Sequence, residues 1–167
     1  MRFVPRPYQH LIRNFALDHA RSNIFSSMGT GKTSATIDTY DTLRAFGEAK
    51  RLLVVAPKRV AKNTWPREVE KWNESFGHLS VAAIIGTEKQ RIAAARAGAD
   101  ITTVNYDNLP WLVEKAGSQW PWDMVVADES PRLKGLRVSL QQRRKKDGTM
   151  GKEFLTGQGS SRAAAWL

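Results

Sequence analysis

A glycine-rich segment near the amino terminus has the residue types and spacing of a phosphate-binding loop. Residues 26–33 read Ser-Ser-Met-Gly-Thr-Gly-Lys-Thr and lead into a stretch with helical periodicity. In such loops the backbone N–H groups surround phosphate oxygens, the lysine reaches the outer phosphates, and the last hydroxyl ligates a magnesium ion. The strict pattern has glycine where Ser26 stands, and a tight strand-to-helix turn is the alternative interpretation.

Two adjacent carboxylates are a second candidate for chemistry. Asp128 and Glu129 directly follow the apolar segment Val-Val-Ala at residues 125–127. An aspartate at the end of such a strand holds the same magnesium ion, commonly through water, and the neighbouring glutamate can polarise an attacking water molecule. Two solvated carboxylates at a strand end are the alternative. Together with the loop, the pair predicts a domain that binds and hydrolyses a nucleoside triphosphate, with Lys32 and Asp128 converging on one pocket.

The elements that must position these residues alternate between strands and helices. We expect strands at residues 23–27, 51–56, 79–85, 100–105 and 122–127. We expect helices at residues 13–18, 32–46 and 107–116, one capped by Thr64, and one opened by the capping box Thr-Glu-Lys-Gln at residues 87–90. Nearly unbroken apolar strands alternating with helices predict a parallel sheet covered on both faces. In such sheets ligands bind at the carboxyl ends of strands, where both the loop and the acidic pair fall.

Two apolar patterns make finer predictions. Leu11 and Phe15 share one face of the first helix. Trp65 and Trp72 lie along a helical stripe, which favours a place in the core over stacking on nucleic acid.

The composition fits one globular domain and excludes several kinds of site. The chain has 167 residues, of which 41% are hydrophobic, and no cysteine, so it can form neither a disulfide nor a thiolate metal site. His10, His19 and His78 lack metal-site spacing and receive no role. The sequence contains no apolar run of about 20 residues and no signal peptide. We therefore expect no membrane partner and a cytoplasmic location.

Positive charge is concentrated after residue 131. Residues 1–131 carry 17 basic and 14 acidic side chains, a net +3, whereas residues 132–167 carry nine and two, a net +7. Such a surplus favours a polyanionic partner, because neutralising phosphates releases counterions. A solvated loop whose charge only maintains solubility is the alternative. Residues 141–148 are expected to form a loop, and residues 160–167 to begin a helix that the chain cuts short.

An ordered series of further motifs resembles the first RecA-like lobe of superfamily 2 helicases. The series reads Arg-Pro-Tyr-Gln at residues 6–9, Val-Val-Ala-Pro-Lys at 54–58, Thr-Val-Asn-Tyr-Asp at 103–107 and Asp-Glu-Ser-Pro-Arg-Leu-Lys at 128–134. It looks most like the Swi/Snf-type branch of double-stranded DNA translocases, particularly the compact versions carried by bacteriophages. The resemblance covers residues 3–135 and implies a single RecA-like P-loop domain of α/β class over residues 1–135. Residues 136–167 would then form a basic loop and an incomplete helix.

The resemblance also implies roles for single residues and a location in a bacterium or phage-infected cell. Gln9 would recognise the adenine edge of ATP with Tyr8 or Arg6 beside it, although a surface glutamine near a helix start is the alternative. The loop residues Met28, Gly29, Thr30, Gly31, Lys32 and Thr33 would hold the phosphates. Thr33 and Asp128 would support Mg²⁺, and Glu129 would be the base for water. The residues along the nucleic acid, expected to be duplex DNA, would be Pro57, Lys58, Asn105, Tyr106, Arg132 and Lys134.

The sequence departs from the family pattern at two places. Ser130-Pro131 stands where the family commonly has Ala-His or a similar pair. Leu-Thr-Gly at residues 155–157 echoes a further family segment but continues differently, and no second RecA-like lobe with arginine fingers follows. We therefore expect either a fragment or a lobe whose second half is encoded separately.

Two other functions are alternatives to an ATPase lobe. A nucleic-acid-binding module that has lost productive catalysis is suggested by the eight basic side chains at residues 132–152, opposed by Asp147 alone. A P-loop kinase for small metabolites is disfavoured, because we find no pattern for an acceptor site or an arginine-bearing lid.

Overall fold

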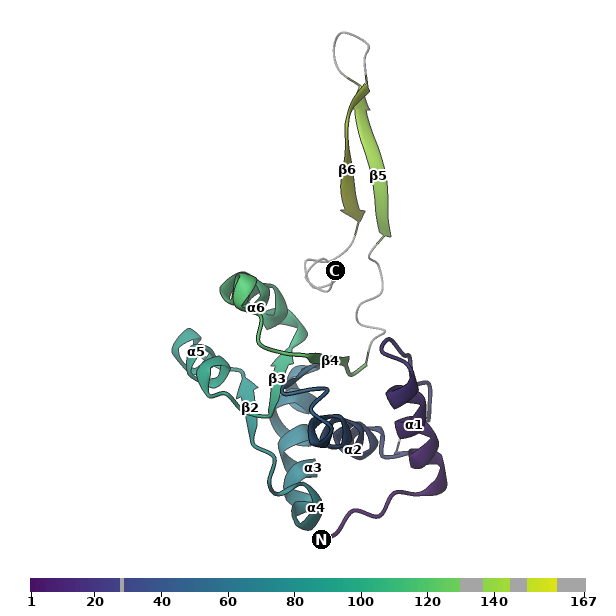
Figure 1. Ribbon diagram of the computed structural model, residues 1–167. Helices are drawn as coiled ribbons and strands as arrows, with labels where there is room; N and C mark the ends of the chain where they lie inside the picture. Colours follow the sequence, from purple (N-terminus) through teal and green to yellow (C-terminus); the bar gives the residue numbers. More distant parts are fainter. Residues whose placement is uncertain (28, 130–136, 145–149, 159–167) are drawn as a thin grey trace.

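The computed structural model describes residues 1–27 and 29–129 in full, and the backbone of two strands at residues 137–144 and 150–158 (Figure 1). Four strands form a parallel sheet in the order β2–β3–β1–β4. Their bounds are β1 (Leu52–Ala56), β2 (Val81–Ile84), β3 (Ile101–Asn105) and β4 (Met124–Ala127). We call the edge where these strands begin the amino edge, and the edge where they end the carboxyl edge. The predicted parallel sheet is confirmed.

Helices connect the strands and flank the sheet. The α-helices of the described residues are α1 (Pro7–Asp18), α2 (Lys32–Ala45), α3 (Trp65–Lys71), α4 (Asn73–Phe76), α5 (Glu88–Arg96) and α6 (Leu109–Ala116). A π-helical turn, η1 (Val60–Thr64), runs directly into α3, and two 3-10 turns, η2 (Tyr106–Asn108) and η3 (Gly117–Gln119), flank α6. Within these residues, no helix combines the length and the apolar character needed to cross a bilayer.

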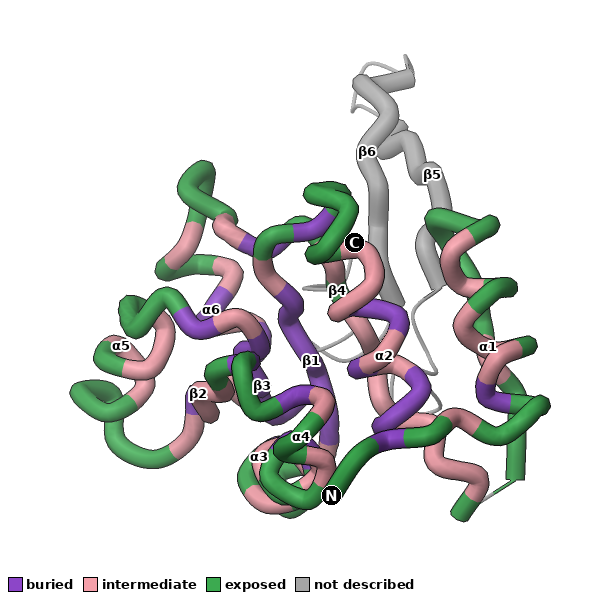
Figure 2. The backbone as a smooth tube through the Cα atoms, turned by 60° about the horizontal axis from the view of Figure 1, so that its bottom comes forward, coloured by how far each residue is buried: buried purple, intermediate pink, exposed green. Residues whose placement is uncertain are grey.

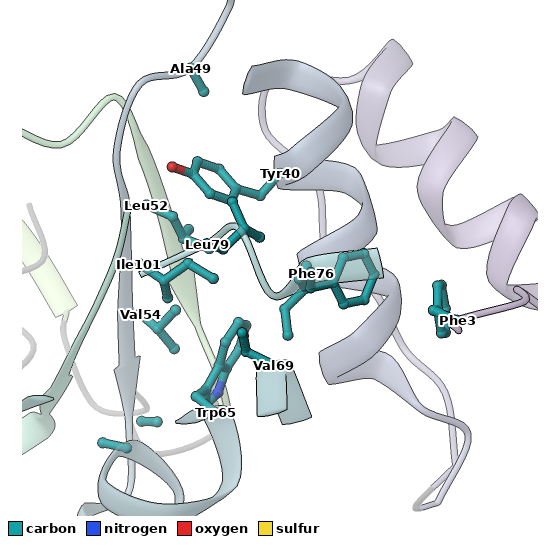
Figure 3. Close-up of a cluster of buried hydrophobic side chains, with 13 residues drawn as sticks. Phe3, Tyr40, Ala49, Leu52, Val54, Trp65, Val69, Phe76, Leu79 and Ile101 are labelled. Carbon is teal, nitrogen blue, oxygen red and sulfur yellow. The ribbon is translucent and has the colours of Figure 1, made fainter. Parts of the chain in front are cut away.

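The sheet separates two apolar clusters, one on each face. Strand β1 is buried throughout (Figure 2), and its alternate side chains point to opposite faces. Leu52 and Val54 join residues of α2, α3 and α4, and lie beside Tyr40 and Trp65 in Figure 3. Leu53 joins the second cluster with residues of α6, against which α5 packs. Helices therefore cover both faces, as predicted, and the fold is α/β.

Two carboxylates hold the amino edge of the sheet together. Oδ2 of Asp100 accepts hydrogen bonds from the N–H and the hydroxyl of Ser80, at 2.8 and 2.6 Å, and Oδ1 accepts from Arg44 at 3.1 Å. The hydroxyl of Tyr40 donates to the backbone carbonyl of Asp100 at 2.9 Å. Burial, together with the nearby charge of Asp100, raises the pKa of Tyr40 to about 12. Oδ2 of Asp123 accepts from two backbone N–H groups just before β1, at 2.8 and 3.2 Å.

Residues 23–27 do not form the predicted strand. They run outside the sheet without regular structure, and the Phe25 side chain is 91% exposed. The backbone carbonyls of Ser26 and Ser27 instead accept hydrogen bonds from Nζ of Lys32, both at 2.9 Å. An apolar run becomes a strand only where a neighbouring strand pairs with its backbone groups, and here those groups serve the glycine-rich loop.

Helix α1 begins at Pro7, six residues before the predicted start, and its face with Leu11 and Phe15 is exposed. Proline is favoured in the first helical turn because its missing N–H would have no helical partner there. Leu11 and Phe15 are 70% and 44% exposed, so the face that they share points to solvent. The helix lies against α2 (Figure 1). An ion pair of 3.2 Å between Arg13 and Asp38 joins the two helices.

The two predicted helix caps have opposite outcomes. Thr64 is not an N-cap, because its backbone is helical (φ −70°, ψ −51°) and its side chain makes no capping bond. The helix has already begun at Val60, in η1. Thr87 is an N-cap: its hydroxyl accepts the N–H of Gln90 at 3.4 Å, and Oε1 of Gln90 accepts the N–H of Thr87 at 2.9 Å.

An antiparallel strand pair follows the lobe in the sequence. Strand β5 (Arg137–Arg144) pairs with β6 (Met150–Gln158), for example Leu140 with Leu155. The predicted loop is therefore wrong at residues 141–144. Ladder hydrogen bonds come from the backbone, so polar residues without an apolar period can still pair. The remaining predicted loop residues 145–148 and the predicted helix start at 160–167 lie outside the described residues.

Candidate functional site

A cavity of about 310 Å³ opens at the carboxyl edge of the sheet. Its lining residues come from the glycine-rich loop, the first turn of α2, helix α3 and the turn after β4. They are Gly29, Gly31, Lys32, Thr33, Glu68, Lys71 and Asp128. The expected convergence of Lys32 and Asp128 on one pocket is confirmed, while the roles assigned to these residues stay predictions.

The glycine-rich loop takes a conformation that only glycine adopts easily. Gly29 and Gly31 have φ angles of +77° and +70°, in the left-handed region. A Cβ on Gly31 would also lie 2.5 Å from Nε2 of Gln9, whereas a Cβ on Gly29 would meet nothing within 4 Å. An alanine at Gly31 would therefore be strained by the backbone angle and would also have to displace the end of the Gln9 side chain. Met28 lies outside the described residues.

Internal hydrogen bonds hold the loop around the lysine. The hydroxyl of Thr30 donates to the backbone carbonyl of Ser27 at 2.9 Å and lies 2.9 Å from the hydroxyl of Ser26. Ser26 stands where the strict loop pattern has glycine, and its hydroxyl joins the loop's own bonds. Nζ of Lys32 donates to the carbonyls of Ser26 and Ser27, so its charge lies within the curve of the loop.

Asp128 is hydrogen-bonded at three of its groups. Its N–H donates to the carbonyl of Val55 at 2.8 Å, which continues the β1–β4 pairing. Its carbonyl accepts from the hydroxyl of Tyr106 at 2.6 Å, and Oδ2 of its carboxylate accepts from the indole N–H of Trp65 at 3.2 Å. The aspartate is therefore fixed from β1, η2 and α3 together.

Glu129 has the only positive φ of a residue other than glycine among those described, at +60°. The left-handed conformation costs such a residue about 1–2 kcal/mol, and strain of this kind concentrates at functional sites. Its side chain is exposed just beyond Asp128. Its assignment as the base for water stays a prediction.

Two cavity residues on α3 were not foreseen from the sequence. Glu68 and Lys71 line the cavity together with the loop residues, and their charged atoms lie 4.0 Å apart. Oε1 of Glu68 also accepts from the indole N–H of Trp72 at 2.7 Å. An i,i+3 pair of opposite charge is indistinguishable in sequence from a solvated helix surface, so only the placement of α3 reveals it. Trp65, 1% exposed, and the half-buried Trp72 belong to the core as predicted.

Gln9 is buried against the glycine-rich loop. Its Oε1 accepts the N–H of Arg6 at 2.9 Å, and its Nε2 donates to the backbone carbonyls of Gly31 at 3.2 Å and Thr30 at 3.4 Å. The alternative of a surface glutamine is thus wrong. Tyr8 is exposed one residue away, 3.5 Å from the guanidinium of Arg6. The roles of Gln9 and Tyr8 toward adenine stay predictions.

The four predicted nucleic-acid residues that the structure describes share the carboxyl edge but differ in exposure. Pro57 and Lys58 follow β1, and Lys58 is exposed. Asn105 and Tyr106, at the end of β3, are only 5% and 2% exposed, so their side chains face the protein. Arg132 and Lys134 lie outside the described residues. Two further basic residues close to Lys58 in the sequence are also exposed, and they were not predicted. They are Arg59 and Lys62.

The oxygen donors at the cavity suit a magnesium ion that is bound together with phosphates. Thr33 supplies a hydroxyl and Asp128 a carboxylate among the residues that line the cavity. Mg²⁺ is commonly bound through one or two carboxylates plus substrate phosphates and water. In the described part of the chain no group of three or more His, Cys, Asp or Glu residues could hold a metal alone. The donor set therefore fits magnesium delivered with a nucleotide.

The sequence matches a known family and a phage protein. A family model described as SNF2-related domain matches residues 15–157. The putative protein p41 of Acyrthosiphon pisum secondary endosymbiont phage 1 is 51% identical over 138 residues, covering 81% of this chain and 30% of that protein.

A solved structure shows the same architecture. The Sulfolobus solfataricus SWI2/SNF2 ATPase core in complex with dsDNA superposes with a TM-score of 0.64 at 24% identity, over 80% of this chain and 27% of that one. At this identity the likeness shows the fold alone, which is RecA-like α/β. The chain thus spans less than a third of the length of either relative.

Proposed function

The chain belongs to the SNF2-related family and is a helicase-like ATPase lobe, and we propose that it binds ATP and magnesium in the cavity at the carboxyl edge. The observation that carries the proposal is the convergence of Lys32, Thr33 and Asp128 on that one cavity. These three residue types, delivered by a glycine-rich loop and a strand end, match the needs of a triphosphate with its metal.

Each residue then has a defined task. The ammonium of Lys32 exchanges the carbonyls of Ser26 and Ser27 for phosphate oxygens, and the loop N–H groups surround the same phosphates. Thr33 and Asp128 hold the magnesium ion, which neutralises charge on the phosphates when bound. Glu129 accepts the proton of the attacking water.

Hydrolysis by the chain alone is expected to be slow. In related phosphoryl-transfer enzymes an arginine finger accelerates the reaction by about 10³–10⁵-fold, and the resemblance assigns such arginines to a second lobe. The chain spans 30% of its phage relative, so the rest of a protein of that length would have room for that lobe. We propose that translocation needs both lobes, because it requires opening and closing around the nucleic acid.

The nucleotide proposal is tested by ATP binding with and without Mg²⁺, measured by isothermal titration calorimetry. Lys32→Ala removes charged hydrogen bonds to phosphate and is expected to weaken binding roughly 10- to 100-fold. Lys50→Ala, which removes an exposed lysine at the amino edge, is the matched control and should bind as the parent does. Equal affinity of all three proteins for ATP would overturn the proposal.

We further propose duplex DNA as the nucleic-acid partner, acted on inside a bacterial host cell. Support comes from the dsDNA in the neighbouring solved complex, the phage origin of the relative, and the exposed Lys58 and Arg59 that follow β1 at the carboxyl edge. The double variant Lys58→Ala/Arg59→Ala should lower the affinity for duplex DNA. It should also reduce the slope of log affinity against log salt concentration by about two, one for each lost phosphate contact. Lys50→Ala/Arg96→Ala, the same charge change at the other end of the lobe, is the control.

The second candidate is a nucleic-acid-binding module without productive catalysis. The net charge of +7 over residues 132–167 favours it. Duplex affinity measured with and without Mg-ATP separates the two functions. An affinity that responds to nucleotide in the parent, but not in Lys32→Ala, supports the motor lobe, whereas an affinity that ignores nucleotide in both supports the module.

A further inference from the structure

The indole of Trp65 is a buried donor directed at the candidate metal-binding acid. The side chain is 1% exposed and packs in the larger apolar cluster with Val54 and Val69. Its N–H nevertheless reaches Oδ2 of Asp128, at 3.2 Å. A buried indole N–H commonly finds a partner, and here that partner lines the cavity.

Tyr106 holds the same residue from another element. Its side chain is 2% exposed, and its hydroxyl donates to the backbone carbonyl of Asp128 at 2.6 Å. The bond is short, and it fixes the peptide that joins Asp128 to the left-handed Glu129. The two aromatic side chains thus act on different groups of one acid.

We propose that Trp65 and Tyr106 are positioning residues that fix Asp128 for magnesium, an inference that rests on the proposed function. The χ2 torsion of a free aspartate is broad, so an unsupported carboxylate would sample many orientations. The indole N–H occupies Oδ2 and leaves the other carboxylate oxygen for the magnesium ion or its water. Because an indole can only donate, this contact also favours an accepting oxygen at that position.

Loss of the contact with Trp65 should lower the affinity for Mg²⁺ more than the affinity for metal-free ATP. Partners that orient a metal ligand typically change metal affinity 10- to 100-fold when they are removed. ATP without metal would be held by the loop and Lys32, whose ammonium bonds to loop carbonyls, whereas the Trp65 indole bonds to Asp128. The expected signature is therefore a loss confined to the Mg²⁺-dependent part of binding.

The first test is Trp65→Phe, which removes the N–H and keeps an aromatic ring in the core. We expect the Mg²⁺ affinity of the ATP complex to fall roughly ten-fold or more, with metal-free ATP affinity within about two-fold of the parent. Trp111→Phe is the matched control, because its indole donates to Glu88 at 3.5 Å on the other face of the sheet. It should leave both affinities unchanged.

The second test is Tyr106→Phe, which keeps the inference testable if Trp65→Phe does not fold. Loss of one neutral hydrogen bond predicts a smaller decrease in Mg²⁺ affinity, roughly three- to ten-fold. The control is Tyr40→Phe, which removes an equally buried hydroxyl from the amino edge. It should affect thermal stability without changing Mg²⁺ affinity.

A spectroscopic test follows the indole directly. The parent has six tryptophans, and the signal that disappears in Trp65→Phe identifies the Trp65 indole N–H in a ¹⁵N-correlated spectrum. Without nucleotide, this signal should have a different chemical shift in Asp128→Asn than in the parent. In the parent, adding Mg²⁺ to the ATP complex should shift the same signal.

The outcomes separate this inference from the proposed function. A parent that binds no ATP overturns both. A parent that binds Mg-ATP, together with unchanged Mg²⁺ affinity in Trp65→Phe and Tyr106→Phe, overturns the positioning roles alone.

Discussion

The two edges of the parallel sheet use carboxylates in opposite ways. At the amino edge, Asp100 accepts hydrogen bonds from Ser80 and Arg44, and Asp123 accepts from two backbone N–H groups. At the carboxyl edge, the Asp128 carboxylate accepts from one indole and borders a cavity. The carboxylates at the amino edge bind neighbouring residues and hold the strands together, whereas Asp128 at the carboxyl edge is available to a ligand. Strand direction explains the difference, because loops at the carboxyl ends diverge and form a crevice.

Helix α2 connects the two edges and shows the same contrast within one element. It begins after Gly31, beside the cavity, and ends before Gly47, at the opposite side. Both glycines have left-handed φ angles, of +70° and +77°. Only Gly31 is also crowded by a neighbouring side chain. The helix thus has an ordinary glycine stop at one end and a constrained site at the other.

The largest expected effect comes from the same substitution at the two edges. In Asp100→Asn the new NH₂ group must face either the donors of Ser80 or the guanidinium of Arg44, so we expect a loss of about 2–3 kcal/mol of unfolding free energy. In Asp128→Asn the amide oxygen can still accept from Trp65, and stability should change by less than about 0.5 kcal/mol. Urea unfolding of both variants measures the difference.

Nucleotide binding should show the reverse order. Asp128→Asn should lose Mg²⁺-dependent ATP binding, and Asp100→Asn should retain it wherever the protein is folded. Similar stability losses in both variants would contradict the division of labour between the edges.

A second pair of variants compares the ends of α2. Alanine in the left-handed region costs about 1–2 kcal/mol, so Gly47→Ala should lose about that much unfolding free energy. Gly31→Ala adds the collision with Gln9 and should lose more. Thermal unfolding of both variants gives the measurement. The extra stability loss of Gly31→Ala over Gly47→Ala is the cost of the close contact between Gln9 of α1 and the loop. Equal losses would show that Gln9 moves aside without cost.

Acid should weaken the amino edge. Partial burial opposes ionisation of Asp100, but hydrogen bonds from Ser80 and the charge of Arg44 outweigh it and hold the pKa of Asp100 below its ordinary value of 3.8. A lowered folded-state pKa contributes stability above the ordinary value, and that contribution is lost as pH falls through the lowered pKa. Urea unfolding between pH 6 and about pH 3 should therefore show decreasing stability, with a shallower slope in Asp100→Asn.

The pKa of Asp38 is shifted in the opposite direction to that of Asp100, so its effect on stability in acid has the opposite sign. Burial outweighs the ion pair with Arg13 and raises the pKa of Asp38, so its contribution is present at low pH and is lost as pH rises through the raised pKa. Asp38→Asn should therefore steepen the loss of stability in acid. A slope that neither variant changes would assign the acid response to other carboxylates.

The parts of the fold that depend on local pattern could be predicted from the sequence. The buried strands, helix α2 and the capping box at Thr87 follow from apolar periodicity and end signals alone. The segment around Phe25 and the exposed face with Leu11 and Phe15 could not be predicted in this way. Their apolar residues carry the right local signal, but whether a partner surface is available depends on distant parts of the chain.

The site shows the same limit at the level of single atoms. The motifs identify Lys32 and Asp128, and parallel connectivity places both at one edge. The stripe that includes Trp65 correctly predicts a core residue, but a period of 3.6 states only which face a ring occupies. It cannot show that the indole N–H reaches Asp128, because that depends on how α3 lies against β4.

The smallest expected effect tests whether every polar group at the carboxyl edge serves the cavity. Thr87 follows β2 at this edge, yet its bonds with Gln90 only cap α5, and it does not line the cavity. Thr87→Ala should lower unfolding free energy by about 0.5–1 kcal/mol, because one N–H of the first helical turn loses its acceptor. ATP and Mg²⁺ affinities should stay unchanged in calorimetry. A change in either affinity would mean that α5 is coupled to the cavity, and the functional region would then extend along the edge beyond β1, β3 and β4.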